Sequence, residues 1–175
     1  KIYSPKLVNI LSLMLNDMMK SGLPRKQMFE RGEPWRDIPK LLLTIDEANK
    51  ILSAKNPLAL DHIISIVREG RKFFTGLLFA SQSIRDYAPE EADSVVLGKL
   101  KTLFELTQYK FIMQQDTNCL PQISRIFDGE FSESQIEQIP RFEQGECILC
   151  ISGSKSLTMR VEVTGQELQL FKGGA

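Results

Sequence analysis

The sequence is poor in the residues that build metal sites and disulfide frameworks. It has one histidine and three cysteines in 175 residues. His62 alone cannot form a multi-histidine metal site. Cys147 and Cys150 have CxxC spacing, but no second CxxC or CxxH pair accompanies them. Cys147 and Cys150 lie in the apolar run ECILCIS, and three cysteines do not make a disulfide framework. We therefore expect buried core cysteines in a reducing compartment, and not zinc or redox ligands.

Long apolar runs and an excess of one charge are also lacking. No stretch of about 18 apolar residues occurs, so the sequence predicts no bilayer-spanning helix. Basic and acidic side chains balance at 22 each. A neutral chain has no overall field that would draw it to DNA or to an anionic membrane surface.

What is present is an alternation of helical and strand patterns. Helical spacing of apolar residues predicts helices over 4–20, 48–52, 56–70, 89–107, 116–126 and 132–139. Apolar runs predict strands over 40–45, 75–83 and 109–115, and a hairpin over 146–152 and 157–163. The polar, turn-rich segment 21–38 is expected to be an exposed loop. This order indicates an α/β fold in one domain, with a mostly parallel sheet flanked by helices and a C-terminal antiparallel β-hairpin.

Two adjacent acids, Asp46 and Glu47, follow the predicted strand 40–45. In a parallel α/β sheet, ligands bind beyond the carboxyl ends of the strands. An aspartate there can hold Mg²⁺ directly or through a water, and a neighbouring glutamate can orient or deprotonate the water that attacks a γ-phosphate. The alternative is electrostatic: acids are favoured at the start of any helix.

Polar groups near the second strand suggest similar chemistry. Gln82 follows the apolar part of the predicted strand 75–83, where an amide could bind the γ-phosphate or the attacking water. Arg68 and Arg71 precede that strand, and arginine binds phosphate through two parallel hydrogen bonds. The alternatives are an amide at the sheet edge for Gln82 and stabilisation of a helix C-terminus for the two arginines.

The order of these features resembles one family. LLLTIDEANKIL, then IVREGRKFFTGLLFASQSIRDY, then the C-terminal SESQIEQIPRFEQGECILCISGSKSLTMRVEV are similar to the core of TrbE-type conjugative transfer and type IV secretion ATPases. These belong to the wider RecA-like group that includes HerA and FtsK. The resemblance covers about residues 38–163, and its most specific parts are the acid pair, the basic helix end and the glutamine.

The resemblance implies a RecA-like motor that uses ATP and Mg²⁺. By it, Asp46 and Glu47 take the Walker B roles, with Asp46 on the metal. Gln82 senses the γ-phosphate, and Arg68 or Arg71 contacts nucleotide across a subunit boundary. It also implies a hexamer at the cytoplasmic face of the cell membrane, peripherally attached. Its partners would be secretion-channel and coupling-ATPase proteins, with any DNA contact indirect.

The chain departs from that family at one point. The phosphate-binding loop GxxxxGK[ST] is absent from this sequence. The most similar segment, SGSKS at 152–156, lacks the spacing of that motif. In the family this loop precedes the Walker B strand. We therefore expect residues 1–175 to be the C-terminal portion of the ATPase domain, inactive without the preceding part.

Two other functions remain open from the sequence. The chain could be a docking module for secretion-channel or coupling proteins, with contacts made by the segment 21–38 and the acidic C-terminal part. It could also be a DNA translocase of the HerA or FtsK type, against which the neutral charge counts.

Overall fold

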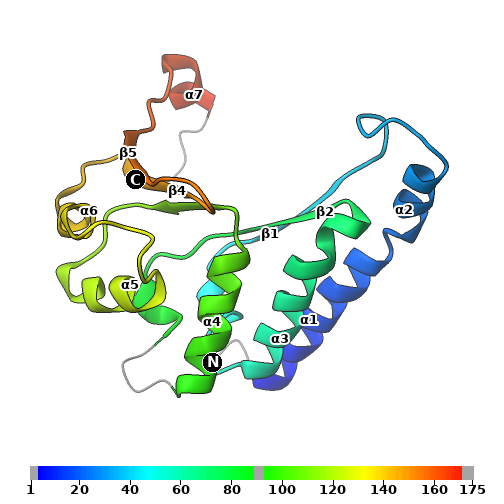
Figure 1. Ribbon diagram of the computed structural model, residues 1–175, viewed down its shortest axis with the longest axis horizontal. Coiled ribbons are helices and arrows are strands. Elements are labelled where there is room, and N and C mark those ends of the chain that lie inside the picture. Colours follow the sequence, from blue (N-terminus) through cyan, green and yellow to red (C-terminus); the bar gives the residue numbers. More distant parts are fainter. Residues whose placement is uncertain (1–3, 89–92, 171–175) are drawn as a thin grey trace.

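The computed structural model describes residues 4–88 and 93–170 (Figure 1). The helices are α1 (Pro5–Lys20), α2 (Leu23–Glu30), α3 (Pro57–Glu69), α4 (Ser94–Leu106), α5 (Leu120–Ile126), α6 (Glu133–Gln138) and α7 (Gly165–Leu170). The strands are β1 (Leu41–Ile45), β2 (Thr75–Phe79), β3 (Tyr109–Ile112), β4 (Glu146–Ile151) and β5 (Leu157–Arg160). The expected start of the helix 89–107, residues 89–92, lies outside the described residues, which resume at Asp93, the N-cap of α4.

The strands form two sheets instead of one mostly parallel sheet. β1 and β2 pair in parallel, with Leu41 opposite Thr75 and Ile45 opposite Phe79. β3, β4 and β5 form a separate antiparallel sheet in that order. The expected hairpin is present as β4 and β5, but β3 joins β4 antiparallel, because the chain between them returns through α5 and α6 to the end of β3 that it left.

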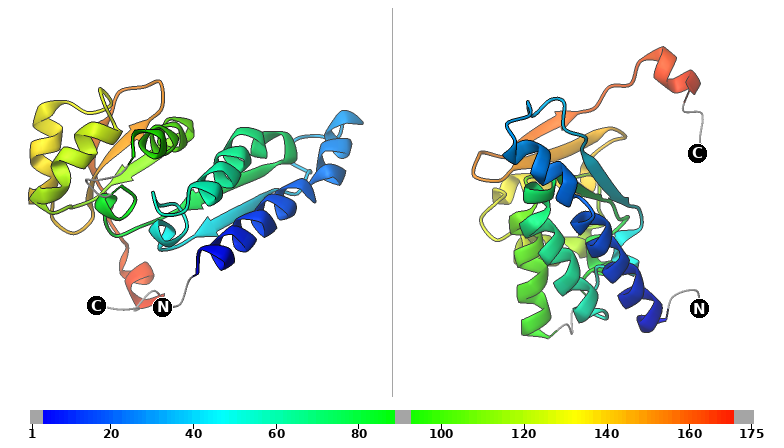
Figure 2. Two further views of the ribbon diagram at one scale, coloured as in Figure 1. Left: turned by 90° about the horizontal axis from the view of Figure 1, so that it is seen from below. Right: turned by 90° about the vertical axis from the view of Figure 1, so that its right-hand side faces the viewer.

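Helices cover one face of the parallel sheet (Figures 1 and 2). α3 packs between α1 and α4, and Leu60, Ile63 and Leu100 are fully buried there. On the other face, Leu42 and Leu78 are more than half exposed. Parallel sheets are normally covered on both faces, so this face is unusually open within the described residues.

The face of α1 that is buried is not its most apolar face. The sequence places Ile10 and Met14 on an apolar face, yet both are exposed, whereas Val8 and Met19 are buried. Ser12 is buried with them, and its hydroxyl lies 2.8 Å from Nδ1 of His62 on α3. No helix within residues 4–88 and 93–170 is long and apolar enough to cross a membrane.

Segment 21–38 contains α2, so the expectation of an irregular loop is corrected. Pro24 lies in the first turn of α2, where its missing N–H costs nothing, and good helix formers follow. Arg25 Nε donates to the carbonyl oxygen of Phe73 at 3.1 Å. Trp35 packs on Phe74 with ring centroids 4.7 Å apart. The segment is mostly exposed but held to the body of the protein by these contacts.

A buried ion pair supports the antiparallel sheet. Lys110 on β3 is almost fully buried, and its Nζ lies 2.7 Å from Oε2 of Glu130. The same carboxylate oxygen accepts from the thiol of Cys150 at 3.1 Å, and Lys110 also donates to Ser152. Burial, and then the hydrogen bond to Glu130, raise the pKa of Cys150 to about 11. As expected, all three cysteines are free and buried.

Candidate functional site

The acid pair follows directly after β1, as the sequence predicts. The carboxylate of Asp46 accepts a hydrogen bond from the Glu47 amide at 2.8 Å. Glu47 adopts φ 48° and ψ 45°, in the left-handed region that non-glycine residues rarely occupy. Its carboxylate forms an ion pair with Lys50, one turn later. Strained backbone of this kind persists only where surrounding contacts hold it.

Backbone hydrogen bonds hold the ends of β1 and β2 side by side. The Ala80 amide donates to the carbonyl oxygen of Ile45 at 3.0 Å, and the Ala48 amide donates to the carbonyl oxygen of Ala80 at 2.8 Å. This second bond follows the left-handed turn at Glu47 and fixes it against β2. Gln82 comes two residues after Ala80, so the acid pair and the glutamine share one edge of the parallel sheet.

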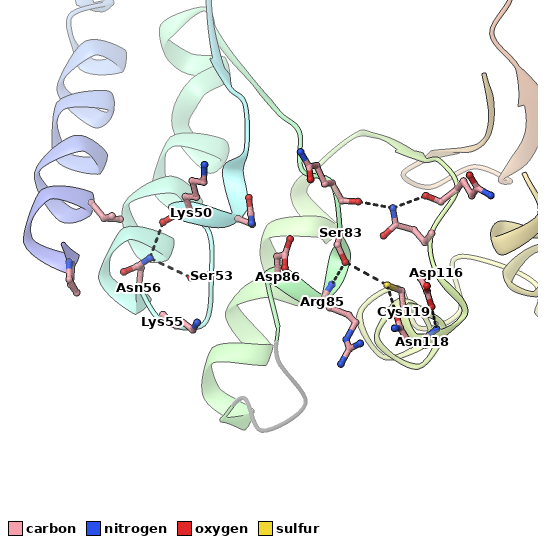
Figure 3. Close-up of a pocket in the computed structure, with 16 residues that line it drawn as sticks. Lys50, Ser53, Lys55, Asn56, Ser83, Arg85, Asp86, Asp116, Asn118 and Cys119 are labelled. Carbon is pink, nitrogen blue, oxygen red and sulfur yellow. Dashed lines mark hydrogen bonds between the residues drawn. The ribbon is translucent and has the colours of Figure 1, made fainter. Parts of the chain in front are cut away.

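An open, polar cleft of about 1050 Å³ lies at this edge (Figure 3). One wall comes from the residues around η1 (Ala48–Lys50) and the start of α3, and includes Lys50, Lys55 and Asn56. The other comes from the segments that follow β2 and β3. Its residues are Gln82, Ser83, Arg85, Asp86, Gln114, Gln115, Asp116, Asn118 and Cys119. Of the predicted site residues, Gln82 lines the cleft. Asp46 and Glu47 are not among its lining residues, although Asn49 and Lys50, which follow them in the chain, are.

Arg68 and Arg71 lie at the opposite edge of the parallel sheet. Arg68 is in the last turn of α3, and Arg71 is in η2 (Gly70–Phe73), just before β2 begins. β2 has five residues, which span roughly 16 Å. Both arginines are exposed. The structure therefore does not bring them to the cleft within one copy of the chain.

Three cations and a glutamine in the cleft were not picked out from the sequence. Lys50, Lys55 and Arg85 line it, as does Gln115. Gln115 was detectable in principle, because it follows β3 as Gln82 follows β2, at the end of an apolar run. The lysines carry no such signal, since lysines are common in exposed turns.

The donor set fits Mg²⁺ only together with a phosphate ligand. Among the described residues, no group of three histidine, cysteine or acidic side chains could hold a metal ion. Mg²⁺ in nucleotide sites typically takes one or two carboxylates and completes its shell with phosphate and water oxygens. Asp46, whose carboxylate is exposed at the sheet edge, meets that requirement.

Comparison with known proteins shows a distant sequence relative and a similarity of fold. No protein-family model matches it. It is 27% identical over 174 residues to an uncharacterized protein of Bacillus anthracis, designated pXO2-09. That alignment covers 99% of this chain but 27% of the relative. The fold is similar to VirB4 of Thermoanaerobacter pseudethanolicus, with a TM-score of 0.62 and 21% identity over 77% of this chain and 34% of VirB4. The chain thus spans about a third or less of the length of both proteins.

Proposed function

We propose that this chain is part of an ATP-hydrolysing motor that energises conjugative DNA transfer or type IV secretion. The observation that carries the proposal is the convergence of Asp46, Glu47 and Gln82 on one edge of the β1–β2 pair. That edge is where open α/β sheets bind ligands. The likeness to VirB4 agrees with the sequence resemblance to secretion ATPases.

Each residue at that edge has a distinct role. When bound, Mg²⁺–ATP would supply the γ-phosphate, and the metal would offset charge on its oxygens. Asp46 would hold the metal, directly or through a water. Glu47 orients the attacking water and accepts its proton. Gln82 donates to a γ-phosphate oxygen from the cleft wall.

Arg68 and Arg71 act on a neighbouring subunit in this proposal. They are exposed and far from their own chain's cleft, so one of them reaches nucleotide only across a subunit boundary in a hexamer. A guanidinium supplied in this way stabilises transition-state charge. The motor would work at the inner face of the cell membrane with channel and coupling proteins, and contact DNA at most indirectly.

Comparing the full-length protein with residues 1–175 tests the proposal. The full-length protein should hydrolyse ATP in the presence of Mg²⁺. Residues 1–175 alone should bind ATP weakly and show no turnover, because GxxxxGK[ST] is not among them. Absence of turnover in the full-length hexamer would refute the proposed function. Tight binding with turnover by residues 1–175 would refute the need for a separate phosphate loop.

A docking role is the second candidate, and the surface of segment 21–38 favours it. Phe29 and Trp35 are 53% and 56% exposed, and both rings pack against Phe74. Exposed aromatic side chains are enriched at protein interfaces. Substituting both with serine should weaken binding to channel proteins while leaving ATP turnover intact. Lost turnover with unchanged binding would reject the docking role.

A further inference from the structure

The side chain of Gln115 connects the segment after β3 to the loop after β2. Its Nε2 donates to the carbonyl oxygen of Gln82 at 3.0 Å. Its Oε1 accepts from the backbone amide of Ile84 at 3.3 Å. One side chain therefore holds the backbone on both sides of Ser83, and bridges two sheets that share no strand pairing in the described residues.

The hydrogen-bond partners determine the orientation of this amide. Nε2 also donates to the carbonyl oxygen of Gln114 at 2.9 Å. With the amide reversed, an oxygen would face two carbonyl oxygens and an NH₂ group would face the Ile84 N–H. Such an arrangement has no favourable contact, so the observed orientation is the stable one.

The loop depends on this contact because Ile84 is buried. Ile84 as a whole residue is only 8% exposed, and a buried backbone amide costs free energy if it is unpaired. Ser83 adds weaker support: its hydroxyl accepts from the Arg85 amide at 3.3 Å and lies 3.6 Å from the Cys119 sulfur (Figure 3). Gln115 is the member of this network that contacts Gln82 itself.

We propose that Gln115 is a positioning residue, which holds the Gln82–Ile84 loop so that Gln82 faces the cleft in the orientation needed for catalysis. The proposal rests on the proposed function for its catalytic part, in which Gln82 donates to the γ-phosphate. Its structural part, the hold on the loop, is independent of any ligand.

Hydrogen exchange in the full-length protein tests the structural part. Gln115→Ala should speed exchange in a peptide spanning residues 80–88 by about tenfold, which corresponds to the loss of one to two ordinary hydrogen bonds. Gln115→Glu keeps the acceptor for Ile84 and the side-chain volume, but places an oxygen against the Gln82 carbonyl. It should fold, and the repulsion between these oxygens should speed exchange in this peptide as well. Gln108 directly precedes β3, at the opposite end of the strand from Gln115. Gln108→Ala should leave the exchange rate of this peptide unchanged. Unchanged exchange in Gln115→Ala would overturn the proposal.

Steady-state kinetics test the catalytic part. Gln115→Ala should lower kcat for ATP by about tenfold or more while KM changes less than about twofold, because the contact orients a catalytic group and does not bind substrate. The double variant Gln82→Ala/Gln115→Ala should be no slower than Gln82→Ala alone, since both substitutions remove the same contribution. Normal kcat in Gln115→Ala, beside an impaired Gln82→Ala, would overturn the proposal and leave the ATPase function standing. A wild-type protein without turnover would refute the proposed function and the catalytic part of this proposal together. Hydrogen exchange would then still test whether Gln115 holds the loop.

Discussion

The carboxylate of Glu47 forms an ion pair with the ammonium group of Lys50, and both side chains are close to half exposed. An exposed pair of this kind contributes on the order of 0–1 kcal/mol. Glu47 can therefore leave Lys50 for a catalytic water at little cost.

Glu47→Gln in the full-length protein should abolish ATP hydrolysis and spare ATP binding. The amide keeps the size of the side chain but cannot accept the proton of the attacking water. Turnover should fall by about 10²-fold or more, the usual contribution of a positioned base. Glu137→Gln, an exposed acid on α6, is the matched control and should hydrolyse ATP normally. Unchanged turnover in Glu47→Gln would remove Glu47 from this role.

Breaking the Lys110–Glu130 pair should have an asymmetric effect on stability. Glu130→Ala leaves the ammonium of Lys110 buried and unpaired, and should lower the free energy of unfolding by about 3–5 kcal/mol. Lys110→Met leaves Glu130, whose side chain is 25% exposed and can be hydrated, so the loss should be smaller. Urea denaturation of both variants measures the difference. Equal losses of unfolding free energy in the two variants would mean that the burial of the Lys110 ammonium does not determine the effect.

Stability should fall at alkaline pH. Burial raises the pKa of Tyr87 to about 12, and it is the main cause that raises the pKa of Cys150 from an ordinary value of 9.0 to about 11. The folded state thus favours both neutral forms, and this stabilisation is complete below pH 9. It is lost as the pH rises from 9 to 12, because the unfolded chain releases these protons first. Tyr87 contributes at most about 3 kcal/mol to this pH-dependent part of the free energy of unfolding.

Urea denaturation at pH 8, 10 and 11.5 checks this trend. In Tyr87→Phe, the loss of unfolding free energy above pH 10 should be smaller, because the tyrosine share is removed. The loss due to Cys150, which begins near pH 9, should remain. A wild-type unfolding free energy that stays constant to pH 11.5 would contradict the expectation.

Gly145 should tolerate alanine less well than Gly153. Both have positive φ, at 85° and 78°, so both substitutions carry backbone strain of about 1 kcal/mol. At Gly145 an added Cβ would also lie 2.7 Å from the carbonyl oxygen of Val161, whereas at Gly153 it would meet nothing within 4 Å. Gly145→Ala should therefore cost about 1–3 kcal/mol more in thermal or urea unfolding. Equal costs would show that the backbone near Val161 yields freely.

Local features could be read from the sequence because their partners lie within a few residues. The Ser4 hydroxyl accepts from the Leu7 amide at 3.3 Å, and Ser132 and Gln135 form a capping box within the SESQ segment. Asn56 is the exception: it precedes α3 without capping it, and its amide donates to the carbonyl oxygen of Lys50 at 3.2 Å instead.

The candidate site was accessible from the sequence in part. Parallel pairing of two successive strands requires their carboxyl ends to meet, so Asp46, Glu47 and Gln82 could be expected at one edge. The same reasoning places Arg68 and Arg71, which precede β2, at the other edge. Gln115 was not foreseen in contact with Gln82, because that contact spans 33 residues and two separate sheets.

The sequence by itself determined most of the elements, their order and the residue types at the strand ends, because hydrophobic period and capping residues act over one or two turns; α2 and α7 were not among the elements expected from it. Only the tertiary structure decided which stripe of α1 is buried, that β3 pairs antiparallel with β4, and that Gln115 holds the loop carrying Gln82. Each of these depends on which surfaces meet after the chain has folded back through several elements. Contacts at that separation arise from packing many side chains together, and no short stretch of sequence contains them.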